Sequence, residues 1–249
     1  MPVLPGAEPW SADGGRTGAL MLHGFTGNPR SMRPWAETLA AAGLTVRLPL
    51  LPGHGTRWQD LQRTRWTDWY GEAERSLAEL AGRCDDVFVM SLSMGGALSL
   101  RLAEEHHLAG QVLVNPAIAS DDRRLRLLPL LSKIIPSVPP VGDDIKAPGV
   151  SESAYARVPT KAAASMSQLW KVLVPDLPKI TAPTLVYRSV DDHVVPKVST
   201  DTLVAGVTHA DVEVVELRES FHVATLDNDA PQIFDGSLAF VRSHTSAAT

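Results

Sequence analysis

The amino-acid sequence predicts an α/β fold, with a mostly parallel β-sheet flanked by helices and a small inserted cap. Short apolar runs alternate with helix-length amphipathic stretches, as expected where each strand is followed by a helix that covers the sheet. This alternation stops between residues 118 and 178, where prolines multiply, strand patterns disappear and the helix-like pieces are short. We therefore assign residues 1–117 and 179–249 to the core and residues 118–178 to the cap.

Short apolar runs predict the strands of the sheet, and several of them end at a Gly-rich turn or a proline. In chain order these runs cover residues 19–22, 45–48, 86–90, 111–114, 184–187 and 212–217. The third run leads into a sharp turn at Ser93, after which a helical pattern begins.

The predicted helices repeat apolar side chains every three or four residues, so that one face can cover the sheet. The clearest of them carries six such side chains, and Gly82 ends it. They are Trp66, Trp69, Tyr70, Ala73, Leu77 and Leu80. Further helices are predicted at about residues 31–42, 97–103, 199–206 and 232–244.

Composition and charge exclude several classes of protein. The 249 residues carry a net charge of −5, which argues against a general nucleic-acid-binding protein. The one cysteine, Cys84, rules out an internal disulfide, and no Cys/His spacing indicates a metal site or another cofactor. The first 15 residues lack the pattern of a secretory signal, and no apolar run reaches membrane-spanning length, so a cytoplasmic protein is expected. The sequence does not indicate an oligomeric state.

Ser93 is the predicted nucleophile of a serine esterase. A turn between a strand and a helix can lift a serine hydroxyl clear of the sheet and set it beside a helix N-terminus. Gly95 and Gly96 give the backbone room for that turn. Ser91 stands where the usual pattern has glycine, and its extra hydroxymethyl group predicts mild crowding without loss of the turn.

His222 is the predicted base, and Asp192 is the predicted acid that orients it. His222 follows the last predicted strand, and Asp192 follows the strand before it, so both belong to the sheet edge that carries Ser93. A carboxylate on one ring nitrogen fixes the tautomer of a catalytic histidine. Asp191 is the rival acid, and we favour Asp192 because the apolar segment that directly follows it resembles the turn after the catalytic acid of a known family.

Two backbone amides are the predicted oxyanion hole. Met94 follows the nucleophile at the start of a helix, and Phe25 lies in the tight turn after the first predicted strand. His23, in the same turn, and His54 are interpreted as residues that hold loops by hydrogen bonds.

Five motifs of the chain resemble those of a known family. They are His23-Gly-Phe-Thr-Gly27, Gly53-His-Gly55, Ser91-Leu-Ser-Met-Gly-Gly96, Asp191-Asp-His-Val-Val-Pro196 and Ser220-Phe-His-Val-Ala-Thr-Leu-Asp227. With these motifs the chain resembles the α/β-hydrolase family, above all its bacterial monoacylglycerol lipases and related carboxylesterases. The resemblance spans about residues 18–240, implies the same triad and oxyanion amides, and departs from the family pattern at Ser91.

The start of the predicted cap is rich in leucine, isoleucine and valine, interleaved with basic residues. Its apolar residues are Leu125, Leu127, Leu128, Leu130, Leu131, Ile134, Ile135, Val138 and Val141. They are expected to pack the cap onto the core, to line an acyl-binding slot, or to touch an anionic membrane surface. Val141 is assigned to substrate binding. Glu152 resembles the cap acid that holds glycerol in monoacylglycerol lipases, the alternative being a solvated carboxylate at a helix end.

The leading hypothesis is hydrolysis of monoacylglycerols with medium-to-long acyl chains through an acyl-enzyme. The alternatives are a general short-chain carboxylesterase, an acyltransferase that uses an acceptor alcohol in place of water, and a non-catalytic binding protein on the same fold. The expected partner is an acyl ester, with peripheral membrane contact through the cap as a further possibility.

Overall fold

The computed structural model describes residues 2–140 and 143–245. Val141, which the sequence assigned to substrate binding, lies outside the described residues. Within them, no helix is both long enough and apolar enough to cross a lipid bilayer.

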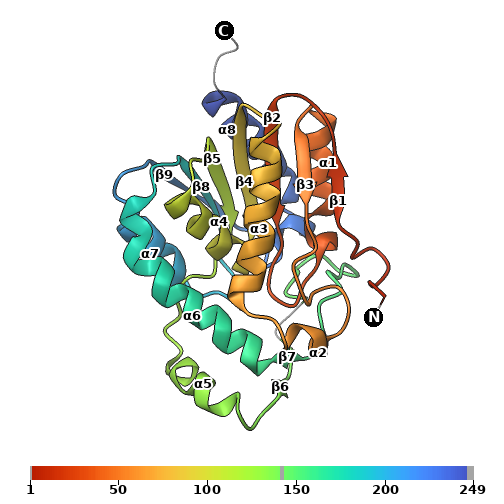
Figure 1. The fold of residues 1–249 in the computed structure, drawn as a ribbon, viewed down its shortest axis with the longest axis vertical. Helices are drawn as coiled ribbons and strands as arrows, with labels where there is room; N and C mark the ends of the chain where they lie inside the picture. The colour runs from red at the N-terminus through yellow and green to blue at the C-terminus, as the bar shows by residue number, and fades with distance from the viewer. Residues whose placement is uncertain (1, 141–142, 246–249) are drawn as a thin grey trace.

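The sheet has seven strands in the order β1-β3-β2-β4-β5-β8-β9 (Figure 1). They are β1 (Trp10–Ala12), β2 (Thr17–Leu22), β3 (Thr45–Leu48), β4 (Asp86–Leu92), β5 (Gly110–Val114), β8 (Thr184–Ser189) and β9 (Val212–Leu217). All neighbours pair in parallel except β1, which runs antiparallel to β3. The predicted mostly parallel sheet and its six predicted strands are confirmed. The edge strand β1 was not predicted, because three residues show no alternating pattern.

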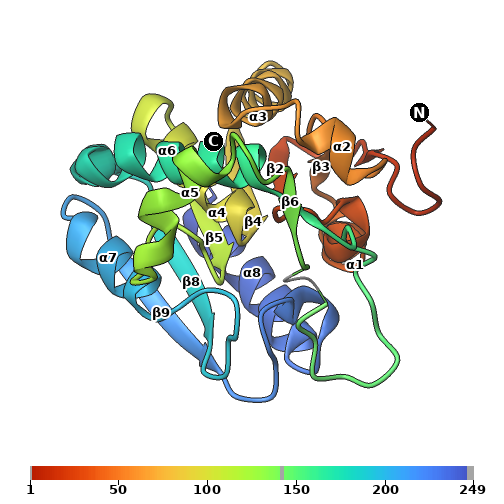
Figure 2. The same cartoon turned by 90° about the horizontal axis from the view of Figure 1, so that it is seen from below.

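Two helical layers cover the two faces of the sheet (Figures 1 and 2). One contains α1 (Arg33–Ala41) and α8 (Ala230–His244); the other contains α3 (Trp66–Ala81), α4 (Met94–Glu105) and α7 (Val198–Gly206). The predicted helices are therefore present, each within a few residues of its expected bounds. A short helix, α2 (Trp58–Leu61), precedes α3.

Alternation along the central strands divides the core into two clusters. In β2, Leu20 packs with the α3 and α4 side, whereas Met21 packs with the α1 and α8 side. In β4, Val89 packs with the α3 and α4 side, and Phe88 packs with the α1 and α8 side. Burying one such side chain contributes about 1.5–3 kcal/mol. Because both faces are buried, the strands are nearly continuous apolar runs, which is why the sequence predicts them well.

The inserted segment contains α5 (Leu128–Leu131), the two-stranded pair β6 (Ser137–Val138) and β7 (Val158–Pro159), and α6 (Thr160–Asp176). Figure 1 shows α5, β6 and β7 at the bottom of the molecule, and Figure 2 shows α5 and β6 from that end. The expectation of only short helical pieces is wrong for α6, which has 17 residues. Its apolar side chains pack against α3 and α4 and so extend the helical layer of the core. The domain boundaries at residues 117 and 179 stay a prediction.

Candidate active site

The turn at Ser93 depends on two glycines. Ser93 has φ 56° and ψ −116°, a left-handed backbone conformation that costs about 1–3 kcal/mol for a non-glycine residue. A Cβ atom on Gly95 would lie 2.2 Å from the carbonyl oxygen of Leu22, and one on Gly96 would lie 2.7 Å from Cβ of Pro116. The close approach of these backbones therefore requires glycine at both positions.

Ser91 fits under this turn without disrupting it. Its side chain is fully buried at the end of β4, and the hydroxyl oxygen lies 3.8 Å from the point that a Cβ of Gly96 would occupy. Among the described residues, Ser91 Oγ has no hydrogen-bond partner. The cost of serine at this position is thus an unsatisfied buried hydroxyl, and the expected mild crowding stays a prediction.

His222 and Asp192 form a hydrogen-bonded pair. His222 Nδ1 donates to Asp192 Oδ2 at 2.9 Å, and Asp192 Oδ1 accepts from the amides of Val194 and Val195 at 2.8 Å each. Burial opposes ionisation of Asp192, but these hydrogen bonds outweigh it, so the pKa of the carboxyl lies below its usual value. With its proton on Nδ1, neutral His222 presents Nε2 as a proton acceptor. Asp191, the rival acid, is exposed.

Two residues that the sequence analysis did not single out support this pair. Arg188 Nη1 lies 3.0 Å from Asp192 Oδ2, and only 11% of the Arg188 side chain is exposed. Asn115 Nδ2 donates to the carbonyl oxygen of His222 at 2.8 Å and also to Ser189 Oγ at 2.9 Å. The available signals were an arginine directly after the predicted strand at residues 184–187, and an asparagine at a strand end on the sheet edge of Ser93.

The two predicted oxyanion amides lie at the ends of neighbouring strands. Phe25 follows β2, and Met94 is the first residue of α4, where helix amides have no partner within the helix. Across the described part of the chain, neither amide donates to another protein group. A Cβ on Gly24 would lie 3.4 Å from Cβ of Ser93, so the turn that carries Phe25 closely approaches the serine.

His23 and His54 are built into the loops, in accord with their interpretation as structural residues. His23 Nδ1 donates to the carbonyl oxygen of Gly24 at 3.0 Å, and its Nε2 accepts from the amide of Leu51 at 3.2 Å. Complete burial lowers the pKa of His23 to about 4, which keeps the ring neutral. His54 is equally buried, its pKa is lowered for the same reason, and its Nδ1 contacts the carbonyl oxygen of Pro52 at 3.2 Å.

A cavity of about 530 Å³ brings these groups together. Ser93, Asp192, His222, Phe25 and Glu152 all border it. Much of the remaining wall comes from the inserted segment and the loop after Asp192, and its apolar residues include Leu125, Leu128, Val158, Met166, Trp170 and Val195. This volume lies within the range of small-molecule sites. No hydrogen bond joins Ser93 to His222 among the described residues, and such contacts often tighten only when substrate binds.

Glu152 is a buried carboxyl group at the cavity wall. Only 6% of the residue is exposed, which excludes the solvated helix-end alternative. Burial raises its pKa, while the amide of Asp143, donating to Oε1 at 3.4 Å, acts in the opposite direction. A Cβ on Gly27 would lie 2.9 Å from Oε2, so glycine at that position leaves room for the carboxylate beside the Phe25 turn.

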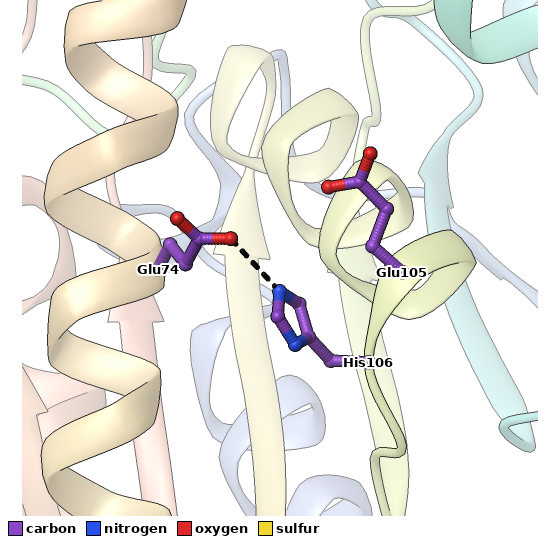
Figure 3. A group of neighbouring side chains, drawn as sticks. All are labelled: Glu74, Glu105 and His106. Carbon is purple, nitrogen blue, oxygen red and sulfur yellow. Dashed lines mark hydrogen bonds and ion pairs between the residues drawn. The ribbon is translucent and has the colours of Figure 1, made fainter.

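A second cluster of ionisable groups lies between α3 and α4, outside the cavity wall (Figure 3). Glu74, Glu105 and His106 place their potential ligand atoms within 4.8 Å of one another. Each already has a protein partner: His106 Nε2 contacts Glu74 Oε1 at 3.0 Å, and Glu105 is paired with Arg101 and Tyr70. The cluster therefore works as a link between the two helices.

Comparison with known proteins places the chain among hydrolases. A model of the alpha/beta hydrolase family matches residues 19–233. The thermostable monoacylglycerol lipase of Bacillus sp. (strain H-257) is 43% identical over 249 residues, which cover 98% of this chain and 97% of that protein. The carboxylesterase of Bacillus subtilis (strain 168) is 24% identical over 223 residues, covering 89% of this chain and 91% of that protein.

Solved structures agree in fold. One of the metagenome-derived lipolytic enzymes LipS and LipT superposes with a TM-score of 0.94 at 39% identity, covering 98% of this chain and 100% of the other. The monoacylglycerol lipase of Paleococcus ferrophilus superposes with a TM-score of 0.79 at 20% identity, covering 96% and 100%, a likeness that shows the fold alone.

Proposed function

Because the chain belongs to the α/β-hydrolase family and is a carboxylic ester hydrolase, we propose that its substrates are monoacylglycerols with medium-to-long acyl chains. The observation that carries this proposal is the hydrogen-bonded Asp192–His222 pair, which borders the same largely apolar cavity as Ser93. The 43% identity to a monoacylglycerol lipase over almost the whole chain supports the choice of substrate.

The proposed mechanism is acyl transfer in two steps. His222 Nε2 takes the proton of Ser93 as the serine oxygen attacks the ester carbonyl, and Asp192 stabilises the imidazolium that forms. Protonated His222 then gives its proton to the leaving glycerol oxygen, which releases glycerol and leaves the acyl group on Ser93. Water, deprotonated by His222, attacks the acyl-enzyme, and the fatty acid leaves as the proton returns to Ser93.

The oxyanion of each tetrahedral intermediate is proposed to bind the amides of Phe25 and Met94. Both amides lie at the sheet edge beside Ser93, and neither is occupied by another protein group among the described residues. One such donor is typically worth about 3 kcal/mol of barrier.

The acyl chain is proposed to lie along the apolar wall formed by Leu125, Leu128, Met166 and Trp170. Each methylene buried against this wall contributes about 0.8 kcal/mol of binding free energy, so the wall favours longer acyl chains over short ones.

The glycerol head is proposed to contact Glu152, a buried polar group that lines the same cavity as these apolar side chains. Glu152→Ala should weaken turnover of monoacylglycerols and spare nitrophenyl esters, whose alcohol makes no such hydrogen bonds. Equal losses on both substrates would remove Glu152 from the glycerol site.

Peripheral membrane contact is proposed for the cap. Four apolar residues there are 41–80% exposed: Leu127, Leu130, Ile134 and Ile135. Exposed Lys133 and Arg123 lie in the same stretch, and together they suit an anionic lipid surface. Sedimentation with vesicles that contain anionic lipid should recover the protein, and Ile134→Ser should reduce the recovered fraction. Equal recovery of both proteins would exclude this surface.

The substrate class is tested by hydrolysis rates on mono-, di- and triacylglycerols across a series of chain lengths. The proposal expects the highest kcat/KM on medium-to-long monoacylglycerols. A maximum on short-chain esters would favour a general carboxylesterase, which the similarity to the Bacillus subtilis enzyme keeps as the second candidate. Transfer products formed in the presence of glycerol would identify an acyltransferase.

A further inference from the structure

Asp144, in the loop between β6 and β7, reaches the two loops that carry the proposed acid and base. Its Oδ2 accepts from the amide of His222 at 3.1 Å and from the amide of His193 at 3.2 Å. Its Oδ1 contacts His193 Nδ1 at 2.8 Å. Only 16% of the Asp144 side chain is exposed. Its backbone takes part as well, since the carbonyl oxygen of Asp144 accepts from the amide of Val223 at 3.1 Å.

The chain around Asp144 is tied to the same base loop by a second carboxylate. Asp227 Oδ2 accepts from the amide of Lys146 at 2.7 Å, and Asp227 Oδ1 accepts from the amide of Ala147 at 2.9 Å. Asp227 Oδ2 also accepts from the amide of Phe221, one residue before the base, at 2.9 Å. Residues 144–147 and 221–227 are therefore linked reciprocally, each segment supplying a carboxylate to amides of the other.

These contacts hold the backbone of His222 at both of its polar groups. Asp144 accepts from its N–H at 3.1 Å, and Asn115 donates to its C=O at 2.8 Å. Asp192 then fixes the orientation of the ring at 2.9 Å. Removing one of the two backbone contacts would let the backbone of His222 move, and the ring would then be held by its hydrogen bond to Asp192 with less precision.

We infer that Asp144 is a positioning residue for the base His222, supplied to the catalytic core by the inserted segment. The inference rests on the proposed Ser93–His222–Asp192 mechanism. Asp144 acts through the backbone of residue 222 and does not touch the reacting atoms. A displacement of about 1 Å in a catalytic group can lower the rate roughly 100-fold, so loss of this contact should act on kcat.

Three substitutions distinguish the contact of Asp144 with the His222 amide from its contact with the His193 ring. Asp144→Ala removes both oxygens and should lower kcat by roughly 10- to 100-fold on a soluble nitrophenyl ester, with KM changed less than about twofold. Asp144→Asn keeps an acceptor for the His222 amide and should restore most of kcat. His193→Ala removes the ring contact with Asp144 but not the His222 contact, and should therefore lower kcat clearly less than Asp144→Ala does.

Asp201→Asn, on α7, is the matched control, because it neutralises a carboxylate in an exposed ion pair with Lys197. It should leave kcat and KM unchanged. Should Asp144→Ala fail to fold, Asp144→Ser carries the same test, since it stays polar but is too short to reach the His222 amide. In each folded variant, the downfield NMR resonance of the His222 Nδ1 proton reports whether the bond to Asp192 is still ordered.

The inference holds if kcat falls, KM stays and the downfield resonance broadens in Asp144→Ala or Asp144→Ser, with recovery in Asp144→Asn. It is overturned if these variants keep kcat within about twofold, or if they lose activity only in proportion to their unfolded fraction. Hydrolysis that persists in Ser93→Ala would instead refute the proposed mechanism. Abolished hydrolysis in Ser93→Ala together with full kcat in Asp144→Ala would refute the positioning role alone.

Discussion

The sheet and the inserted segment of this protein are held together in different ways. In the core, strands such as β2 and β4 are buried on both faces, and helices such as α3 cover them with an apolar stripe. In the segment before α6, several of the large apolar side chains are exposed, Ile134 by 80%. Side-chain hydrogen bonds tie that segment together instead, for example from Ser151 to Asp143 and from Arg157 to Ser137.

Because of this difference, we expect the two regions to respond differently to substitution. Side chains and backbone atoms in the core are closely packed, so a single added atom can lower the free energy of unfolding. In the segment before α6, exposed apolar residues contribute little to folding, whereas individual polar contacts set local positions. Stability should therefore be most sensitive to changes in the core, and the placement of His222 should be most sensitive to polar contacts from the insert.

The turn at Ser93 is expected to give one of the largest effects on stability. Gly95→Ala places a Cβ 2.2 Å from the carbonyl oxygen of Leu22 and should lower the free energy of unfolding by about 3 kcal/mol. Gly71→Ala in α3 is the matched control: its Cβ would meet nothing within 4 Å, and it should raise stability by up to about 1 kcal/mol. Urea denaturation measures both, and an unchanged midpoint for Gly95→Ala would show that the turn is not tightly packed.

A pH-dependent effect is expected from Glu152. Burial raises its pKa above the ordinary 4.5, so the folded protein keeps a proton that the unfolded chain releases. The unfolding free energy therefore loses a contribution as pH rises from about 4.5 through the pKa of the folded state. Glu152→Gln should remove this contribution, so its stability relative to the unsubstituted protein should grow over that range.

The measurement is a series of urea midpoints between pH 4 and pH 8. Glu216→Gln, at an exposed position in β9, serves as the control and should follow the pH dependence of the unsubstituted protein. If Glu152→Gln also follows that curve, Glu152 does not titrate differently in the folded and unfolded states.

A smaller gain is expected at Ser91. Ser91→Ala removes a buried hydroxyl that lacks a partner among the described residues, and should raise the free energy of unfolding by about 1 kcal/mol. Ser99→Ala is the opposite case, because Ser99 Oγ donates to Gln111 Oε1 at 2.9 Å, and it should cost about 1 kcal/mol. Chemical denaturation distinguishes the two, and equal losses would mean that Ser91 is satisfied in solution.

The smallest effect is expected at Ile134, in the segment before α6. Ile134→Ser changes a side chain that is 80% exposed and should alter the free energy of unfolding by less than about 0.5 kcal/mol. Leu20→Ala, in fully buried β2, should cost about 3 kcal/mol. Thermal unfolding compares the two directly, and a large loss for Ile134→Ser would place that residue in a core.

The sequence predicts those parts of the molecule that repeat a physical pattern. Buried strands such as β4 and amphipathic helices such as α3 have a period, and the Ser93 turn and the Asp192–His222 pair follow from the chain order at one sheet edge. The length of α6 was missed because its alanines and serines give a weak apolar stripe. β1 was missed because it is short.

Single polar contacts between distant segments leave no comparable pattern. Asp144 meets His222 across 78 positions of the chain, and Asn115 meets it across 107. Nothing adjacent to either residue in sequence indicates which amide or carbonyl it will bind. Arg188 differs, since it lies only four residues before Asp192, and the loop after β8 brings its guanidinium to the carboxylate.

The central claim is that the left-handed turn at Ser93 presents a hydroxyl that His222 activates. Mass spectrometry of the protein after reaction with a fluorophosphonate tests it most directly. The account predicts one phosphonyl group on the peptide that contains Ser93, no adduct in Ser93→Ala, and labelling slowed by orders of magnitude in His222→Ala. Modification of a different residue, or an unchanged rate in His222→Ala, would contradict it.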